Sequence, residues 1–313
     1  MAQMANSKPE SGRGRRRQAN NDILSLSFTG AEMLRSTWKL LCTVAFAALL
    51  DAVILAPGLA LAQEELARCV GKGNVAPSLR VSACTIIIET GVLSGKNLAA
   101  MFNNRGLAYQ MSRDYARFIA DFDEAIRLDP ANPLAFYNRA RSHHLQKDYD
   151  RALADYDKGL SLDPKDAGAY MNRGNLYHDR GDTKRAIADY DVAIQIRPAD
   201  PRAFYNRCGA LVEIGHAEGA LADCNEVLRL SPDYTPAFLL RGDANFALAR
   251  FEQAAADFDA FLRQEPKNAW ALYGRGMAKT KTGDAAGGAA DIKAAKALSA
   301  DIDEDFADYF GLK

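Results

Sequence analysis

Residues 173–198 read RGNLYHDRGDTKRAIADYDVAIQIRP, and this stretch decides the fold. It begins with an Arg and a small residue, passes through a polar turn at Gly181 and Asp182, and ends at Pro198. An Asp followed by a Tyr lies between the turn and the Pro. The same order of residue types returns every 34 residues along the chain, which is the mark of an internal repeat.

Three columns of residues follow the 34-residue period. They are the Arg column (Arg105, Arg139, Arg173, Arg207, Arg241, Arg275), the Asp column (Asp121, Asp155, Asp189, Asp223, Asp257, Asp291) and the Pro column (Pro130, Pro164, Pro198, Pro232, Pro266, with Ala300 in the sixth place). A small residue follows each Arg, and a bulky or apolar residue follows each Asp. Chance does not keep such columns in register over about 200 residues, so this region is an array of six units.

Each unit is predicted to form two helices joined by a short polar turn. In the second unit we expect the first helix over 135–147 and the second over 150–162. The Pro that follows ends the second helix, because a Pro disfavours helical backbone in the residue before it.

This combination resembles the tetratricopeptide repeat, over residues 99–302. The matching columns also include the aromatic or apolar start (Phe102, Phe136, Tyr170, Phe204, Phe238, Leu272) and Ala at the twentieth position (Ala152, Ala186, Ala220, Ala254). The resemblance implies an all-α fold, a right-handed superhelical solenoid of six helix-turn-helix repeats. The stretch from Arg173 to Pro198 is similar to exported bacterial members of the family.

A few positions depart from the pattern. Phe118 takes the twentieth position of the first unit, where we expect it to widen the helix pair or to turn toward the preceding segment. Gly288 takes the same position in the last unit, and His143, Asn245 and Lys279 are polar residues at the eleventh position. These departures predict irregular packing at those places.

Capping segments are predicted on both sides of the array. Within 63–98, residues 78–90 form an apolar helix that is expected to cover the first repeat, with a short segment before it. Residues 303–313 contain Phe306, Tyr309 and Phe310 among acidic residues, which predicts a final helix that covers the last repeat. Terminal units of a repeat array must hide an apolar face.

The first 62 residues have a different character. Residues 1–32 are polar and basic, and we interpret them as a disordered tail. Residues 33–62 combine Arg35 and Lys39 with an apolar run over 40–62 that ends in Ala60-Leu61-Ala62, which predicts a signal peptide cleaved after Ala62. The alternative is an uncleaved anchor through 40–62, and Met33 is an alternative start. Both place the repeats outside the cytoplasm, periplasmic or secreted in the first case and anchored to the inner membrane in the second.

Composition and charge argue against one class of partner, nucleic acid. The chain of 313 residues has a formal net charge of −1, and 48% of its residues are hydrophobic, as in an ordered soluble protein. Residues 63–313 hold 32 basic and 36 acidic residues, a net charge of −4. A nucleic-acid partner is therefore not expected.

The cysteines predict disulfides. Four of the five lie after Ala62, and an even number in an exported chain favours pairing as Cys69–Cys84 and Cys208–Cys224. In a repeat of two antiparallel helices the eighth residue lies opposite about the twenty-fourth, and these are the places of Cys208 and Cys224. Buried free thiols are the alternative. Metal binding is not expected, because no clustered Cys or His accompanies them.

The Arg and Asp columns face each other by the same rule. They form either a charged ladder for ligands or an ion pair between the two helices of each repeat, and the second interpretation is preferred because every unit keeps the pair. Exposed pairs of this kind contribute only about 0–1 kcal/mol each.

The resemblance also implies a binding groove. In the family, positions two, five, six, nine and twelve of the first helix line the inner face, and these are the candidate partner-binding residues: Asn104, Tyr137, Asn138, Arg141, His144, Asn172, Asn175, His178, Arg202, Tyr205 and Asn206. The Asn residues would bond a peptide backbone, and the Tyr residues would supply flat contact area.

We therefore expect a non-catalytic scaffold or adaptor of the bacterial envelope that binds a peptide or a partner protein. The alternative is a structural component that packs within a membrane-associated or self-associated complex without a free peptide ligand. A metal-dependent hydrolase that uses His144 and His178 is a remote alternative, since nothing supplies further ligands. The chain has no fingerprint for a cofactor, and we expect none.

Overall fold

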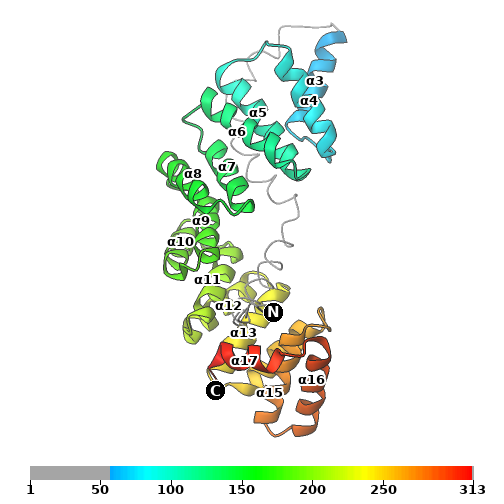
Figure 1. The fold of residues 1–313 in the computed structure, drawn as a ribbon, viewed down its shortest axis with the longest axis vertical. Coiled ribbons are helices and arrows are strands. Elements are labelled where there is room, and N and C mark those ends of the chain that lie inside the picture. Colours follow the sequence, from blue (N-terminus) through cyan, green and yellow to red (C-terminus); the bar gives the residue numbers. More distant parts are fainter. Residues whose placement is uncertain (1–56, 312–313) are drawn as a thin grey trace, which may run out of the picture. The chain divides into compact units, whose positions relative to one another are not determined.

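The computed structural model describes residues 57–311, and each regular element in that part of the chain is an α-helix (Figure 1). The helices are α3 (Pro57–Cys69), α4 (Pro77–Glu89), α5 (Gly95–Met111), α6 (Tyr115–Leu128), α7 (Pro133–Leu145), α8 (Tyr149–Leu162), α9 (Ala167–Asp179), α10 (Thr183–Ile196), α11 (Pro201–Glu213), α12 (Ala217–Leu230), α13 (Thr235–Ala247), α14 (Phe251–Leu262), α15 (Ala269–Lys281), α16 (Ala285–Leu298) and α17 (Ile302–Phe310). The all-α prediction is confirmed. The basic tail and most of the predicted signal segment lie outside the described residues.

The six predicted repeats are six consecutive helix pairs, from α5–α6 to α15–α16. The described residues form two compact units, residues 57–198 and residues 199–311. The first unit contains α3, α4 and repeats 1–3. The second contains repeats 4–6 and α17.

Asp and Asn side chains start most of these helices. Asp114, Asp148, Asp182 and Asp284 each accept a hydrogen bond from the backbone N–H three residues later, at the start of the second helix of a repeat. Such a cap satisfies one of the N–H groups that the first turn leaves without a partner. His216 and Arg250 hold the same place in repeats 4 and 5 and make no such bond.

The turn between the two helices of each repeat requires a left-handed residue at position fifteen. Gly181, Gly215 and Gly283 have φ of 83°, 79° and 96°. Arg113, Lys147 and Ala249 take the same place with φ of 57°, 62° and 55°. Side chains disfavour this conformation, so three of the six turns carry a residue that is poorly suited to them.

A small residue on the first helix packs against a large one on the second, as the columns predicted. A Cβ atom on Gly106 would lie 2.8 Å from Phe122, and one on Gly242 would lie 2.8 Å from Phe258. The contact between the small and the large residue is therefore as close in repeat 1 as in repeat 5. Phe118 is fully buried, with its ring 6.2 Å from that of Phe122.

In repeat 4 a disulfide takes the place of the small and large pair. Cys208 and Cys224 are joined, with their Cα atoms 5.8 Å apart, and both are fully buried. Cys69 and Cys84 are joined in the same way, with their Cα atoms 4.8 Å apart.

The segment before the first repeat differs from the prediction. We expected a single helix over 78–90 after a short segment, whereas the structure has a helical pair, α3 and α4. The disulfide ties the end of α3 to the middle of α4, and the buried cluster around it includes Ala83 and Met101. The predicted cleavage point after Ala62 lies within α3.

Candidate protein-binding face

The Arg and Asp columns form the same ion pair in all six repeats. In each, Nε and Nη2 of the Arg donate to the carboxylate of the Asp that lies 16 residues later, at 2.6–3.0 Å. The Asp side chains are only 6–11% exposed. The structural interpretation is confirmed, but these pairs are buried and not the exposed pairs that we expected.

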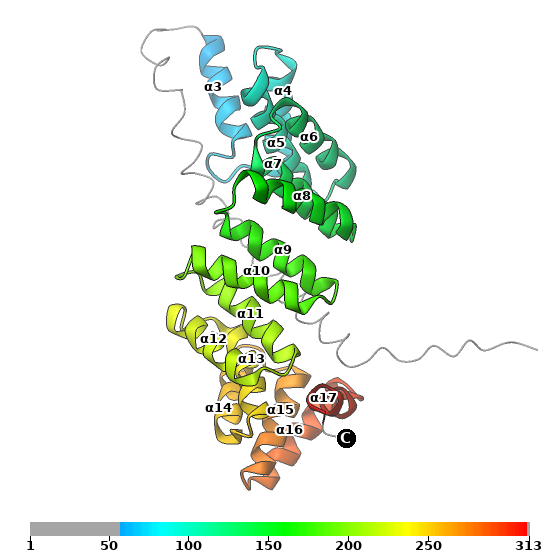
Figure 2. The same ribbon diagram turned by 90° about the vertical axis from the view of Figure 1, so that its left-hand side faces the viewer.

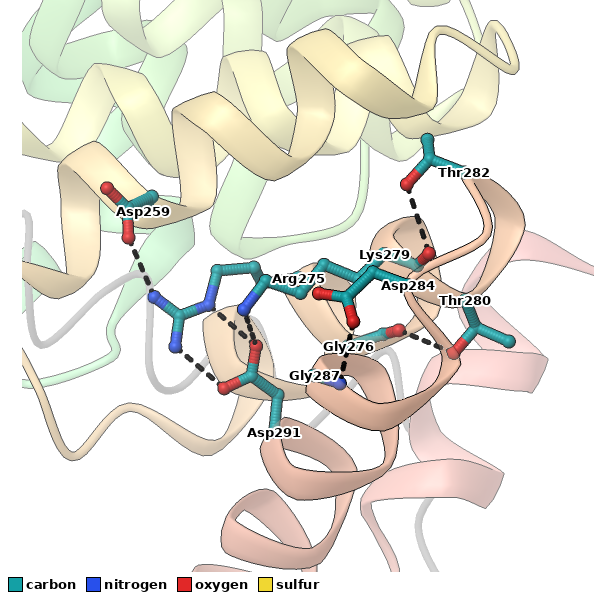
Figure 3. A network of polar contacts seen from close by, with 9 residues as sticks. All are labelled: Asp259, Arg275, Gly276, Lys279, Thr280, Thr282, Asp284, Gly287 and Asp291. Carbon is teal, nitrogen blue, oxygen red and sulfur yellow. Dashed lines mark hydrogen bonds and ion pairs between the residues drawn. The ribbon is translucent and has the colours of Figure 1, made fainter.

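The third guanidinium nitrogen joins neighbouring repeats. Nη1 of Arg275 donates to Asp259 of the preceding repeat at 2.8 Å while the other two nitrogens hold Asp291 (Figure 3). Arg139 reaches Asp123 and Arg173 reaches Asp157 in the same way, at 2.6 Å each. One Arg therefore fixes both the register within its repeat and the contact with the repeat before it.

The aromatic column and the polar eleventh residues serve the same ion pairs. The guanidinium of Arg173 lies 5.4 Å from the ring centre of Tyr170, and that of Arg241 lies 5.4 Å from Phe238. Asn245 donates to Asp257 at 2.8 Å, and Lys279 donates to Asp291 at 2.8 Å. The prediction of irregular packing at the eleventh position is wrong at these two places, because the residues are further donors to the buried Asp.

Burial and hydrogen bonding move the pKa values of these groups in opposite directions. The hydrogen bonds with Asp155 raise the pKa of Arg139, and those with Asp189 raise the pKa of Arg173. Burial is the largest influence on Asp121 and raises its pKa, although Arg105 opposes this. Near neutral pH the Arg stays protonated, and its charge is what keeps a buried carboxylate tolerable.

We call the residues at positions two, five, six, nine and twelve of each first helix the inner-face residues. In repeats 1–3 several of them connect successive first helices. Asn138 donates to Asn103 at 2.9 Å, Arg141 donates to Gln110, and His144 lies 2.7 Å from Asp179. The first helices α5, α7 and α9 therefore share one polar, hydrogen-bonded face.

Three of the predicted binding residues are buried. The prediction that Tyr137 and Tyr205 supply flat contact area to a partner is therefore wrong. Tyr137 is 8% exposed. Its ring packs directly on Gly159, where a Cβ atom would lie only 2.2 Å from the ring. Its hydroxyl donates to the backbone carbonyl of Asp163 at 3.1 Å. Tyr205 is 5% exposed and lies 5.1 Å from the ring of Tyr234. Asn104 is also buried. These side chains hold helices together and present little surface to a partner.

The remaining predicted residues are partly exposed: Asn138, Arg141, His144, Asn172, Asn175, His178, Arg202 and Asn206. Asn175 accepts a hydrogen bond from Tyr190 at 2.8 Å, and Arg202 bonds Asp200, its neighbour at the start of α11. Burial lowers the pKa of Arg141. Six of these eight residues lie in repeats 2 and 3.

His144, one of the two histidines considered for a metal site, has other partners in the structure. His144 pairs with Asp179, and its ring lies edge-on to Tyr149 at 5.9 Å. Within residues 57–311 no three His, Cys, Asp or Glu side chains come together in an arrangement able to hold a metal ion.

Repeats 5 and 6 present a different inner face, which the sequence analysis did not single out. The same positions hold Leu240, Asp243, Phe246, Trp270 and Tyr273. Trp270 donates from its ring N–H to Asp243 at 2.8 Å. Helix α17 lies against this surface, beside α13 and α15 (Figures 1 and 2). The sequence did contain a signal for this difference. Position six is Asn in repeats 2 and 3 but Leu or Gly in repeats 5 and 6, and position twelve is His in repeats 2 and 3 but Phe in repeat 5.

No helix among the described residues is both long enough and apolar enough to cross a membrane. This concerns residues 57–311, and most of the apolar run at 40–62 lies outside them.

Comparison with solved structures shows the same fold at low sequence identity. PilF from Pseudomonas aeruginosa is 19% identical with a TM-score of 0.60, over 69% of this chain and 97% of that one. PilW, a type IV pilus biogenesis factor, is 21% identical with a TM-score of 0.57, over 67% and 97%. YrrB, described as having an unusual peptide-binding site, is 24% identical with a TM-score of 0.53, over 59% and 95%.

A search of curated proteins found no match. Family models described as tetratricopeptide repeat match residues 103–167, 139–204 and 239–302, which together are more than half of the chain. With six helix pairs in register with a 34-residue period, the chain belongs to the tetratricopeptide repeat family.

Proposed function

We propose that this chain is a non-catalytic scaffold of the bacterial envelope that holds a peptide, or an extended segment of a partner protein, against the inner face of repeats 1–3. The observation that carries the proposal is the polar, partly exposed set of Asn, Arg and His side chains on α7 and α9. The Arg and Asp columns bond to each other within the array and are the same in every repeat. The inner-face residues differ from one repeat to the next, as expected of residues that select a partner.

The chemistry of this face suits a peptide backbone. A side-chain amide offers two donors and one acceptor, and Asn138 uses one donor toward Asn103. Asn172 and Asn175 follow one repeat later, three residues apart on one side of α9. A row of amides can bond the N–H and C=O groups of an extended segment without selecting its side chains. The charge of −4 over 63–313 argues against nucleic acid.

Export from the cytoplasm is part of the proposal. The basic and apolar pattern of residues 33–62 supports it, and so do the two cysteine pairs, because disulfides persist in oxidising compartments. Acid precipitation of whole cells, followed by denaturation and alkylation with a thiol-reactive polymer, tests this through the redox state of the cysteines. We expect the four cysteines after Ala62 to be protected until a reductant is added, and four reactive thiols would contradict export.

Selection from a random peptide library on the purified chain tests the binding face. The test variant is Asn138→Ala with Asn172→Ala, and the matched control is Gln146→Ala with Gln195→Ala, which removes two exposed amides elsewhere in the same compact unit. We expect selected peptides to bind the test variant at least about tenfold more weakly and the control unchanged, since each lost hydrogen bond contributes about 1 kcal/mol. Equal binding to both variants would reject this face. A failure to select any peptide would favour the structural-component alternative.

A further inference from the structure

Helix α17 does not continue the stacking of the repeats. Phe306, which is fully buried, lies with its ring 5.1 Å from Phe246, 4.9 Å from Trp270 and 5.1 Å from Tyr273. Phe246 and Trp270 belong to α13 and α15, the first helices of repeats 5 and 6. The helix therefore lies across the inner face, and the prediction that it simply covers the last repeat needs this correction.

The contact extends along the whole aromatic side of α17. Tyr309 lies 5.0 Å from Trp270, and Phe310 lies 5.0 Å from Phe246. Tyr309 also packs against the buried cluster that contains Leu240 of α13. Because residues i, i+3 and i+4 of a helix share one side, Phe306, Tyr309 and Phe310 form a single apolar edge that rests on repeats 5 and 6.

The end of the array does not need α17 as a cover. The exposed residues of α16 include six that are small or charged and one that is large and apolar: Ala286, Ala289, Ala290, Lys293, Ala294, Ala297 and Leu298. Leu298 is the one large apolar side chain among them, so this surface offers little for an aromatic edge to pack against. The aromatic edge of α17 is therefore matched to the inner face and not to the open end.

We propose that α17 is an internal ligand, and that the inner face of repeats 5 and 6 is a docking surface for a partner helix of the same chemistry. That partner is a short helical segment with aromatic residues at i, i+3 and i+4 and acidic residues between and before them, as Asp303, Glu304, Asp305 and Asp308 are placed in α17. A helix whose apolar side lies in a groove is a general mode of peptide recognition. The inference rests on the proposed role as a protein-binding scaffold, but it uses different repeats.

Tethering makes α17 a strong competitor. Only residues 299–301 separate it from α16, and the exposed pair Lys296–Asp303 also links the two helices. A short tether gives an internal ligand an effective concentration in the millimolar range. The intact chain should therefore bind a partner helix weakly, and loss of the aromatic edge of α17 should expose the surface.

Trp270 reports on this surface directly. In a Trp38→Phe background it is the remaining tryptophan of the chain. The probe is a synthetic peptide of residues 301–313, added to the intact chain, to the Phe306→Ala/Phe310→Ala variant, and to the control variant Glu304→Ala, which alters an exposed residue of α17. We expect the Trp270 emission of the double variant to shift to the red, and the peptide to reverse that shift. The peptide should bind the double variant at least about tenfold more tightly than the intact chain or the control.

Two results of the peptide-binding experiment would overturn the proposal. One is equal peptide binding by the double variant and the intact chain, with both helical by circular dichroism. The other is tight binding of a peptide that carries the same two Ala substitutions. Hydrogen exchange on the unmodified chain adds a measurement that needs no variant: amides of α17 should be at least about tenfold less protected than those of α13, and equal protection would contradict release. Asn138→Ala with Asn172→Ala should leave this peptide's affinity unchanged, so failure here is separate from failure of the proposed function.

Discussion

The carboxylate of Asp189 accepts two hydrogen bonds from Arg173, at 2.8 Å from Nε and 2.7 Å from Nη2, across the interface between α9 and α10. The third nitrogen of Arg173 donates to Asp157 on α8 at 2.6 Å. One side chain thus joins two helices of its own repeat to the repeat before it. A compact cation cannot make three such bonds in fixed directions, whereas the planar guanidinium can.

Arg173→Lys should therefore destabilise the chain although it keeps the charge. We expect the free energy of unfolding to fall by about 1.5–3 kcal/mol, because the buried Asp189 loses one of its two donors. Urea denaturation followed by circular dichroism measures the change. The matched control is Arg185→Lys, which alters an exposed pair with Asp182 and should change stability by about 0.5 kcal/mol or less. Equal losses in the two variants would mean that the buried geometry is unimportant.

The turn at position fifteen gives a second prediction. Ala249 has φ of 55° at a position where Gly215 has φ of 79°. Ala249→Gly should raise the free energy of unfolding by about 0.5–1 kcal/mol, since relief of the left-handed conformation outweighs the added entropy of the unfolded chain.

Gly215→Ala is the opposite substitution at an equivalent place. A Cβ atom there would meet nothing within 4 Å, so the backbone conformation alone decides the outcome. We expect a loss of about 1 kcal/mol in the same denaturation experiment. A gain in this variant, or a loss in Ala249→Gly, would contradict the argument.

The Cys208–Cys224 disulfide gives a third prediction. It closes a loop with a sequence separation of 16, for which the chain-entropy model gives about 3 kcal/mol. Addition of a reductant should lower the melting temperature of the intact chain, while the melting temperature of Cys208→Ala/Cys224→Ala should respond only through the other disulfide. The reduced intact chain keeps the two buried sulfur atoms, which the variant lacks. The difference in melting temperature between these two proteins, both measured with reductant, therefore gives the contribution of sulfur packing. Peptide mapping that finds both thiols free in the purified protein would remove the basis of this prediction.

Much of the fold follows from the columns, because the Arg, the Asp and the small and large positions constrain the same helix pair. The inner face was less predictable. Tyr137 occupies a binding position by its number, yet it fills the space above Gly159, which lies 22 residues later in the second helix. Only the identity of that opposite residue could have indicated burial.

The place of α17 could not be predicted from its own composition. Its aromatic edge suited either the open end of the array or the inner face. The Ala and Lys residues on α16 and the aromatic residues Phe246 and Trp270 decide between them, and that comparison requires knowing which sides of α13, α15 and α16 are exposed. The polar residues at position eleven were predicted to disturb the packing for a similar reason. Their partners are the buried Asp residues of the second helix, which lie far from them in the sequence.

His143 gives the last prediction, which concerns pH. It is 6% exposed, at the eleventh position of repeat 2, with Nε2 3.9 Å from Asp155. Burial is the largest influence on it and lowers its pKa from the ordinary value of 6.5; Asp155 and Asp148 oppose the shift, while Arg139 and Arg151 add to it. In the unfolded chain this histidine takes up a proton near pH 6.5, whereas in the folded chain it does so only at lower pH. The unfolded state therefore binds more protons below about pH 6.5, and stability must fall as the pH is lowered from there toward the folded pKa.

His143→Asn separates this effect from the other titrating groups, because Asn245 at the equivalent position of repeat 5 donates to its Asp at 2.8 Å. Urea denaturation at about pH 7.5 and about pH 5.5 should show a smaller loss of stability on acidification in the variant than in the intact chain. At about pH 7.5 the variant should be close to the intact chain, since the new amide can donate to Asp155. If both proteins lose the same stability between the two pH values, His143 is not held neutral by its surroundings.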